Sequence, residues 1–128
     1  MKKIIETAAA PSPVGPYNQA ILAGKTLYVS GQIAIDPSTG VLVQSDIEAE
    51  THQVMKNLSA ILTQAGSSFE DVVKCSVFVK DMHMYGRINT VYSSYFDDAT
   101  APARELVEVS NLPKFVNVEI SLIAHLSR

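Results

Sequence analysis

Residues 101–109, Ala-Pro-Ala-Arg-Glu-Leu-Val-Glu-Val, decide how the C-terminal part of the chain is expected to fold. The segment is entered from a proline and its apolar side chains alternate with others, which predicts a short β-strand. A second alternating run covers residues 116–124, after a loop that contains Pro113. We therefore expect two final strands, 104–109 and 116–124, that lie side by side. Arg104 begins the first of them, and a permanent cation in a core strand needs an explanation.

The alternation also predicts which side chains share a face of the sheet, because successive residues of a strand point to opposite faces. Arg104 and Leu106 share one face, and Glu119 belongs to the polar face of the last strand. If these two faces coincide, Glu119 lies near Arg104, while Val107 on the opposite face packs against helices. On the residues alone, Arg104 and Glu119 are most simply a cross-strand charge pair at a subunit contact.

Two upstream segments carry apolar side chains at the three- and four-residue spacing of a helix. The first covers residues 47–65, and Gly66 supplies the left-handed residue that ends it. The second covers residues 84–96. Both patterns are amphipathic, so we expect each helix to bury one face against the sheet.

The remaining strands are predicted from alternation and from turn residues. In residues 73–80, Val73, Cys75 and two further valines alternate with other side chains, which predicts a strand with one apolar face. Gly24-Lys25 is a candidate two-residue turn of an N-terminal hairpin. The order of elements is β-β-α-β-α-β-β, which predicts an α+β fold with both helices on one face of a mixed sheet.

Composition limits the setting of the protein. The 128 residues suit one domain, and only 18% are charged against 47% hydrophobic, which indicates surface covered in an oligomer. The net charge of −3 argues against nucleic acid as the primary ligand. The lysines at the N-terminus are not followed by an apolar run, so no signal peptide or membrane segment is expected. The single cysteine, Cys75, allows no intramolecular disulfide or cysteine metal cluster and favours the cytoplasm.

Several short motifs spread over nearly the whole chain point to one family. Each motif is weak alone, but their order and spacing make the combination specific. On them the chain resembles the RidA (YjgF) family of reactive-intermediate imine deaminases. The motifs are Gly15-Pro16-Tyr17, Ser30-Gly31-Gln32, Asn89 after Ile88, Ala103-Arg104, Leu112-Pro113-Lys114 and Val118-Glu119-Ile120.

The resemblance implies a single RidA-like domain over residues 1–128 with a chorismate-mutase-like fold. It implies a homotrimer whose sites lie in the clefts between subunits. It also implies hydrolysis of the reactive enamines and 2-imino acids that pyridoxal-phosphate dehydratases release from serine or threonine, namely 2-aminoacrylate, 2-iminopropanoate and 2-iminobutanoate. The products are 2-oxo acids and ammonia, and no metal or organic cofactor is required.

Three residues suit this chemistry by their own properties. Arg104 is able to clamp the substrate carboxylate through two parallel hydrogen bonds, which fixes the plane of the ligand. Glu119 is able to orient a water for attack on the imine carbon and then to handle the proton. Tyr17 is expected to contribute a wall and a hydroxyl group.

The resemblance assigns four further residues to substrate binding. Ser30, Gly31 and Asn89 are expected to shape the pocket, and the backbone at Leu106 is expected to contact the reacting nitrogen or the carboxylate. Many relatives carry Ser and then Cys after the arginine, where this chain has Glu105 and Leu106. We expect this departure to bear on pocket size and substrate choice.

Two other function classes remain open on the sequence. One is a non-catalytic sensor of small acids, or a chaperone-like trimer, built on the same fold. The other is a ribonuclease or translation inhibitor, a label that family members sometimes carry; the acidic balance, the lack of a basic stripe and the lack of a histidine pair place it last. His52, His83 and His125 share no metal-ligand spacing, and Cys75 is expected in the core.

Overall fold

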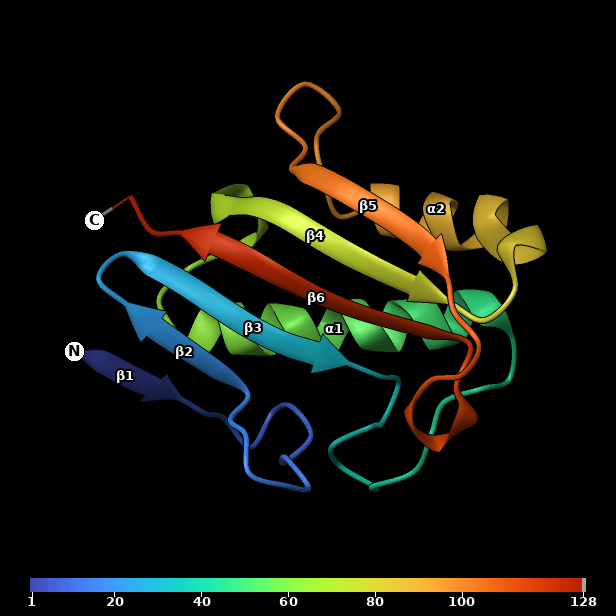
Figure 1. The fold of residues 1–128 in the computed structure, drawn as a ribbon, viewed down its shortest axis with the longest axis horizontal. Coiled ribbons are helices and arrows are strands. Elements are labelled where there is room, and N and C mark those ends of the chain that lie inside the picture. Colours follow the sequence, from blue (N-terminus) through green and yellow to red (C-terminus); the bar gives the residue numbers. More distant parts are fainter. Residues whose placement is uncertain (128) are drawn as a thin grey trace.

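Both α-helices pack on one face of a six-stranded sheet, and the other face is open (Figure 1). The structure is a computed structural model that describes residues 1–127. It confirms the α+β class and the mixed sheet. The strands are β1 (Lys2–Ile5), β2 (Ala20–Ala23), β3 (Thr26–Gln32), β4 (Val72–Val79), β5 (Ala103–Glu108) and β6 (Val118–His125); the helices are α1 (Ile47–Gln64) and α2 (Tyr85–Ser93), with 3₁₀ turns at Phe69–Asp71, Met82–Met84 and Pro113–Phe115.

The strands lie in the order β1-β2-β3-β6-β4-β5. All neighbouring pairs are antiparallel except β4 and β5, which are parallel because the segment containing α2 carries the chain back across the sheet between them. β1 is an additional strand that was not predicted, since Lys2–Ile5 is too short to show a clear alternation. No helix within residues 1–127 combines the length and the apolar character needed to cross a membrane.

The prediction that the last two strands lie side by side is wrong. β4 lies between them and pairs with β5 on one side and with β6 on the other. β4 suits this central place because four of its eight side chains are buried, whereas none of the side chains of β5 is fully buried. β5 is therefore an edge strand, and its two glutamates suit an edge that must not pair with other chains.

The faces of β5 also differ from the prediction. Arg104 pairs with Cys75 and Leu106 pairs with Val77, so both side chains lie on the helix-covered face. Val107, which was predicted to pack against the helices, lies on the open face with 42% of its surface exposed. The alternation along β5 is as predicted, but the face that carries Arg104 lies toward the helices, because the guanidinium packs over the Tyr92 ring and donates to Asn89 of α2.

The last strand follows the prediction more closely. Val118, Ile120 and Leu122 of β6 are buried against the helices, as expected. Glu119 pairs with Phe78 of β4 on the opposite, open face. Arg104 and Glu119 therefore lie on opposite faces of one sheet, with β4 between their strands. The predicted cross-strand charge pair does not exist within the chain.

The two predicted helices are confirmed, with differences at their ends. α1 begins after Asp46, whose carboxylate accepts a hydrogen bond from the Ala49 amide at 2.7 Å, and the chain leaves it through Gly66 with φ of 78°. α2 is shorter than the predicted 84–96, because its final residues turn into irregular backbone.

The hairpin and the β4 strand were also predicted, with one error. Gly24 has φ of 62° in the turn between β2 and β3, as the hairpin requires. Cys75 is buried in the core, as expected. Val73 is exposed instead of buried, because the pairing of β4 with β6 shifts register between Val72 and Lys74.

Candidate active site

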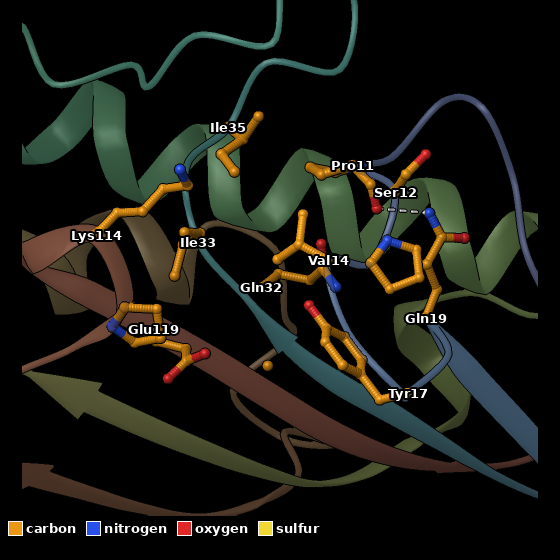
Figure 2. Close-up of a pocket in the computed structure, with 13 residues that line it drawn as sticks. Pro11, Ser12, Val14, Tyr17, Gln19, Gln32, Ile33, Ile35, Lys114 and Glu119 are labelled. Carbon is orange, nitrogen blue, oxygen red and sulfur yellow. Dashed lines mark hydrogen bonds between the residues drawn. The ribbon is translucent and has the colours of Figure 1, made fainter.

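A pocket of about 150 Å³ lies beside Glu119 at the start of β6 (Figure 2). Three segments far apart in the sequence enclose it: the proline-rich loop before β2, the end of β3 with the loop that follows, and the 3₁₀ turn before β6. Pro11, Pro13 and Pro16 restrict the backbone of the first of these segments, which suits a wall. The lining residues are Pro11, Ser12, Pro13, Val14, Tyr17, Gln19, Gly31, Gln32, Ile33, Ile35, Pro113, Lys114 and Glu119.

The Glu119 carboxylate occupies the space that a side chain at position 31 would need. A Cβ atom on Gly31 would lie 2.6 Å from Glu119 Oε2 and 2.9 Å from its Cδ, both too close for real atoms. Gly31 lies where the pairing of β3 with β6 shifts register between Val29 and Gln32, a β-bulge that reshapes the strand locally. Glycine at this position therefore gives Glu119 its place at the pocket.

Burial also changes the acidity of Glu119. The side chain is partly buried, and loss of hydration raises the pKa of its carboxyl group above the usual value. Within residues 1–127 no hydrogen bond or ion pair to this carboxylate is formed, so its oxygens are available to a water or a ligand. A carboxylate of this kind suits proton transfer.

The proline-rich loop is fixed to the sheet by Ser30 and Gln19. The Ser30 hydroxyl donates to the Asn18 carbonyl at 2.6 Å, and the Ser30 amide donates to the Gln19 carbonyl at 2.9 Å. The buried Gln19 amide group in turn holds the backbone of Thr7 and Pro11. Ser30 therefore supports the wall of the pocket, and its side chain is not among the lining groups.

Tyr17 follows this loop and lies across the pocket from Glu119 (Figure 2). The residue is 48% exposed, and its amide donates to the Gly15 carbonyl at 2.8 Å in a tight turn. The Tyr17 ring thus forms part of the wall of the pocket. Tyr17, Gly31 and Glu119 are brought together by the fold.

Arg104 lies in a different place, against one face of α2. Its Nη1 donates to Asn89 Oδ1 at 2.7 Å, and its Nη2 donates to the Tyr85 hydroxyl at 3.2 Å. The guanidinium also lies over the Tyr92 ring, 5.0 Å from the ring centre, a cation–π distance. Tyr85, Asn89 and Tyr92 are spaced i, i+4 and i+7, so they share one face of the helix. We call these three residues the α2 cradle.

The charge of Arg104 has no acidic partner within residues 1–127. A guanidinium has five N–H donors, and the cradle uses two of them. The remaining donors are free to bind an anion, and a carboxylate matches the planar geometry of the group. Leu106, two residues further on β5, is partly buried and packs against the core on the same face, and its backbone lies in the edge strand of the sheet.

The seven predicted site residues therefore form two separate groups in one chain. Glu119, Gly31 and Tyr17 meet at the pocket, with Ser30 supporting it, while Arg104 lies with Asn89 and near Leu106 on the other face. Two strand spacings of about 4.8 Å separate β5 from β6, and the side chains point to opposite faces. One small ligand cannot reach both charged groups within one chain.

Three residues that hold the site were missed in the sequence. Tyr85 and Tyr92 had a usable signal, because they flank Asn89 at helical spacing. Glu50 of α1 gave none: its buried carboxylate accepts from the Asn117 amide and from Asn117 Nδ2, both at 2.8 Å, and so fixes the chain just before Glu119. In the described part of the chain, no three His, Cys, Asp or Glu side chains gather as metal ligands would.

The chain is similar to known proteins over almost its whole length. Residues 7–126 match the family model described as Endoribonuclease L-PSP. A RutC family protein of Synechocystis is 53% identical over 95% of both chains. The 2-iminobutanoate/2-iminopropanoate deaminase of Mus musculus is 43% identical over 97% of this chain and 91% of its own.

Solved structures agree with these relatives. A protein of the conserved Rid family from Yersinia pestis superposes with a TM-score of 0.95 at 48% identity, covering 98% of this chain and all of its own. The crystal structure of Escherichia coli TdcF with bound serine gives a TM-score of 0.92 at 40% identity, covering 98% and 99% of the two chains.

Proposed function

This chain belongs to the Endoribonuclease L-PSP family, also called the YjgF/RidA family, and on that premise we propose that it hydrolyses reactive 2-imino acids and their enamine forms to 2-oxo acids and ammonia. The proposal is supported by the name of the mammalian relatives, which are deaminases of 2-iminobutanoate and 2-iminopropanoate. It is also supported by the serine bound in TdcF, a small ligand with the same carboxylate group.

The observation that carries the proposal is the unpaired guanidinium of Arg104 in the α2 cradle. A structural arginine would be expected to face a carboxylate, but the cradle holds Arg104 with an amide oxygen, a hydroxyl and an aromatic ring. Each of these contacts orients the group without neutralising it. A held, unneutralised guanidinium with free donors is suited to a ligand carboxylate.

Glu119 then acts on water. Its carboxylate takes a proton from a water whose oxygen bonds to the imine carbon, and the proton passes to the substrate nitrogen. The new hydroxyl group then gives its own proton, again by way of Glu119, to the nitrogen as the carbon–nitrogen bond breaks with its electron pair on nitrogen. Ammonia leaves, and the carbonyl of the 2-oxo acid forms. One water is consumed for each imine, and nothing is oxidised or reduced. The raised pKa of Glu119 suits a group that both accepts and returns a proton.

The separation of Arg104 from Glu119 requires a second copy of the chain in this mechanism. We propose that Arg104 of one subunit faces the Glu119 pocket of the next, and that a homotrimer closes three such sites. The edge position of β5 and the open sheet face support such contacts. Sedimentation should show a trimer in dilute solution, and a stable monomer at micromolar concentration would contradict this part of the proposal.

The reaction is tested by trapping the imine. A pyridoxal-phosphate dehydratase acting on serine or threonine generates the substrate, and semicarbazide traps what remains with and without this protein. Faster loss of trappable imine is the expected result. Unchanged trapping, together with measurable binding of 2-oxo acids, would instead favour a sensor that binds small acids without turnover.

The shared site is tested by mixing subunits. Arg104→Lys and Glu119→Gln chains should each be poorly active, but co-expressed they should form sites that combine an intact Arg104 with an intact Glu119. In a random trimer about a quarter of the sites are of this kind, so about a quarter of the wild-type activity should return. No recovery in mixed trimers would place both residues in the same subunit's site.

The name of the family model favours a second candidate, ribonuclease activity. The residues give it little support, because His52 contacts Tyr95 and His83 contacts Asp81, so these two histidines are engaged separately. The net charge of −3 also disfavours an RNA backbone. Cleavage of RNA that survives the Glu119→Gln change and falls steeply with salt would support this candidate against the deaminase.

A further inference from the structure

The pocket beside Glu119 is larger than a one- or two-carbon side chain needs. Its volume is about 150 Å³. An apolar cavity of roughly 150 Å³ accommodates a ring of six carbons. The methyl group of 2-iminopropanoate or the ethyl group of 2-iminobutanoate would leave most of this space to water.

The walls of the pocket are mainly apolar. Glu119 stands at one side, and much of the remaining lining consists of proline, isoleucine and valine side chains with the Tyr17 ring (Figure 2). Gln19 also lines the pocket, but its side-chain amide is already bonded to the loop backbone. Ser12 and Lys114 are exposed, so solvent reaches them. Gln32 also lines the pocket, and its amide nitrogen donates to the Ser30 carbonyl at 3.4 Å. The interior therefore offers mainly apolar contact area, with Gln32 and Glu119 as its polar side chains.

The proposed chemistry assigns this space to one part of the substrate. The carboxylate of a 2-imino acid goes to Arg104 of the neighbouring subunit, and the imine carbon must lie close to Glu119. The third substituent on that carbon is the amino-acid side chain. It is the part of the ligand left to fill the apolar pocket between Tyr17 and Ile33.

We propose that the preferred substrates of this site are 2-imino acids with apolar side chains of leucine to phenylalanine size, an inference that rests on the proposed function. Each buried carbon strengthens binding about fourfold, so a leucine-derived ligand should bind roughly 60-fold more tightly than an alanine-derived one. The class of reaction that supplies such substrates is the two-electron oxidation of an apolar amino acid, in which a flavin or nicotinamide of the supplying enzyme takes the electrons and the 2-imino acid is released.

The test uses 2-oxo acids as product analogues, because they are stable and carry the same carboxylate and side chain. The wild-type protein is titrated in a calorimeter with pyruvate, 2-oxobutanoate, 2-oxo-4-methylpentanoate and phenylpyruvate. Affinity should rise along the first three compounds, and phenylpyruvate should bind at least as well as 2-oxobutanoate. The same order is expected for kcat/KM with imines made in place by an amino acid oxidase.

A pocket-filling variant links the preference to this space. Val14→Phe adds a ring to an exposed lining residue, so the fold should be unaffected. This variant should weaken the binding of 2-oxo-4-methylpentanoate at least fivefold and change the affinity for pyruvate less than twofold. Val41→Phe is the matched control, because Val41 is an exposed valine outside the pocket lining. This substitution should alter the affinity for neither 2-oxo acid.

The outcomes separate this inference from the function on which it rests. Binding of all four acids with equal affinity, or best binding of pyruvate, would overturn the size preference and leave the deaminase proposal in place. A size preference that Val14→Phe does not alter would also overturn the inference, because the side chain would then lie elsewhere. Failure of every 2-oxo acid to bind, with no loss of imine in the trapping assay, would overturn both.

Discussion

The Glu119 pocket and the α2 cradle carry opposite charges, and the surroundings of the two charged groups differ. At the pocket, space is left open: Gly31 has no side chain, and the Glu119 carboxylate has no hydrogen-bond partner within residues 1–127. At the cradle, space is filled, and Arg104 has two hydrogen bonds and an aromatic ring beneath it. The acid is therefore free to change protonation, whereas the cation is held in one orientation.

We expect the largest loss of activity when the carboxylate of the Glu119 pocket is replaced. Glu119→Gln keeps the shape of the side chain but removes the proton acceptor, so deamination should fall roughly 10²–10⁴-fold. Binding of 2-oxo acids should be retained, because the amide has the same shape as the carboxylate and introduces no new clash. Imine trapping and calorimetry check the two halves. Glu70→Gln, on an exposed turn, is the control, and unchanged turnover in Glu119→Gln would remove Glu119 from the mechanism.

We expect a smaller loss of activity when the arginine held by the α2 cradle is replaced. Arg104→Lys keeps the charge but loses the planar pair of donors, so the imine should react at least ~10-fold more slowly, about 1.4 kcal/mol at the transition state. The melting temperature should be similar and 2-oxo acid binding weaker. Arg87→Lys is the matched control on the same helix, since Arg87 also binds in a two-point manner, but to exposed Glu48. Full activity with unaltered binding in Arg104→Lys would refute the clamp.

A smaller effect tests whether orientation matters as the cradle suggests. Tyr85→Phe keeps the ring but removes the oxygen that accepts from Arg104 Nη2. A hydrogen bond of this kind is worth about 1 kcal/mol, so KM and the dissociation constant for 2-oxo acids should rise about fivefold with kcat little changed. Tyr95→Phe is the control, because its hydroxyl contacts His52. Equal effects of the two changes would reduce the role of Tyr85 to general stability.

The smallest expected effect is on thermal stability, which should depend on pH through the Glu119 carboxyl group of the pocket. Burial raises the Glu119 pKa, so the folded protein holds this proton more tightly than the unfolded chain does. Stability contributed by the protonated form is complete below the usual glutamate pKa and is lost as pH rises through the raised folded value. Glu119→Gln should therefore melt slightly higher than wild type at pH 7, with the difference vanishing toward pH 4. A difference that does not depend on pH would contradict the shift.

Much of the local structure was predictable because it depends on neighbouring residues. The spacing in 47–65 and the stop at Gly66 define α1 without tertiary information. The alternation in β6 placed Ile120 inward and Glu119 outward correctly. Adjacency of strands is a different matter, because alternation assigns faces but says nothing about which strand is next in the sheet.

The site was predictable only in part for the same reason. Tyr17, Gly31 and Glu119 were named by the family motifs, and the fold does bring them together. Arg104 was named as well, but its face could not be read from β5, where a cation over an aromatic ring takes a place normally held by an apolar side chain. The sequence alone therefore could not show that the two charges lie on opposite sides of the sheet.

The close approach of Gly31 to Glu119 sets the order in which these positions can change during evolution. Any side chain at position 31 displaces the carboxylate, so a lineage that needs the acid cannot accept even alanine there. Once the acid is lost or shortened, the constraint on glycine disappears and position 31 is free to drift. The acid therefore has to be lost before the glycine, and a chain with glycine at position 31 but without the acid is the expected intermediate.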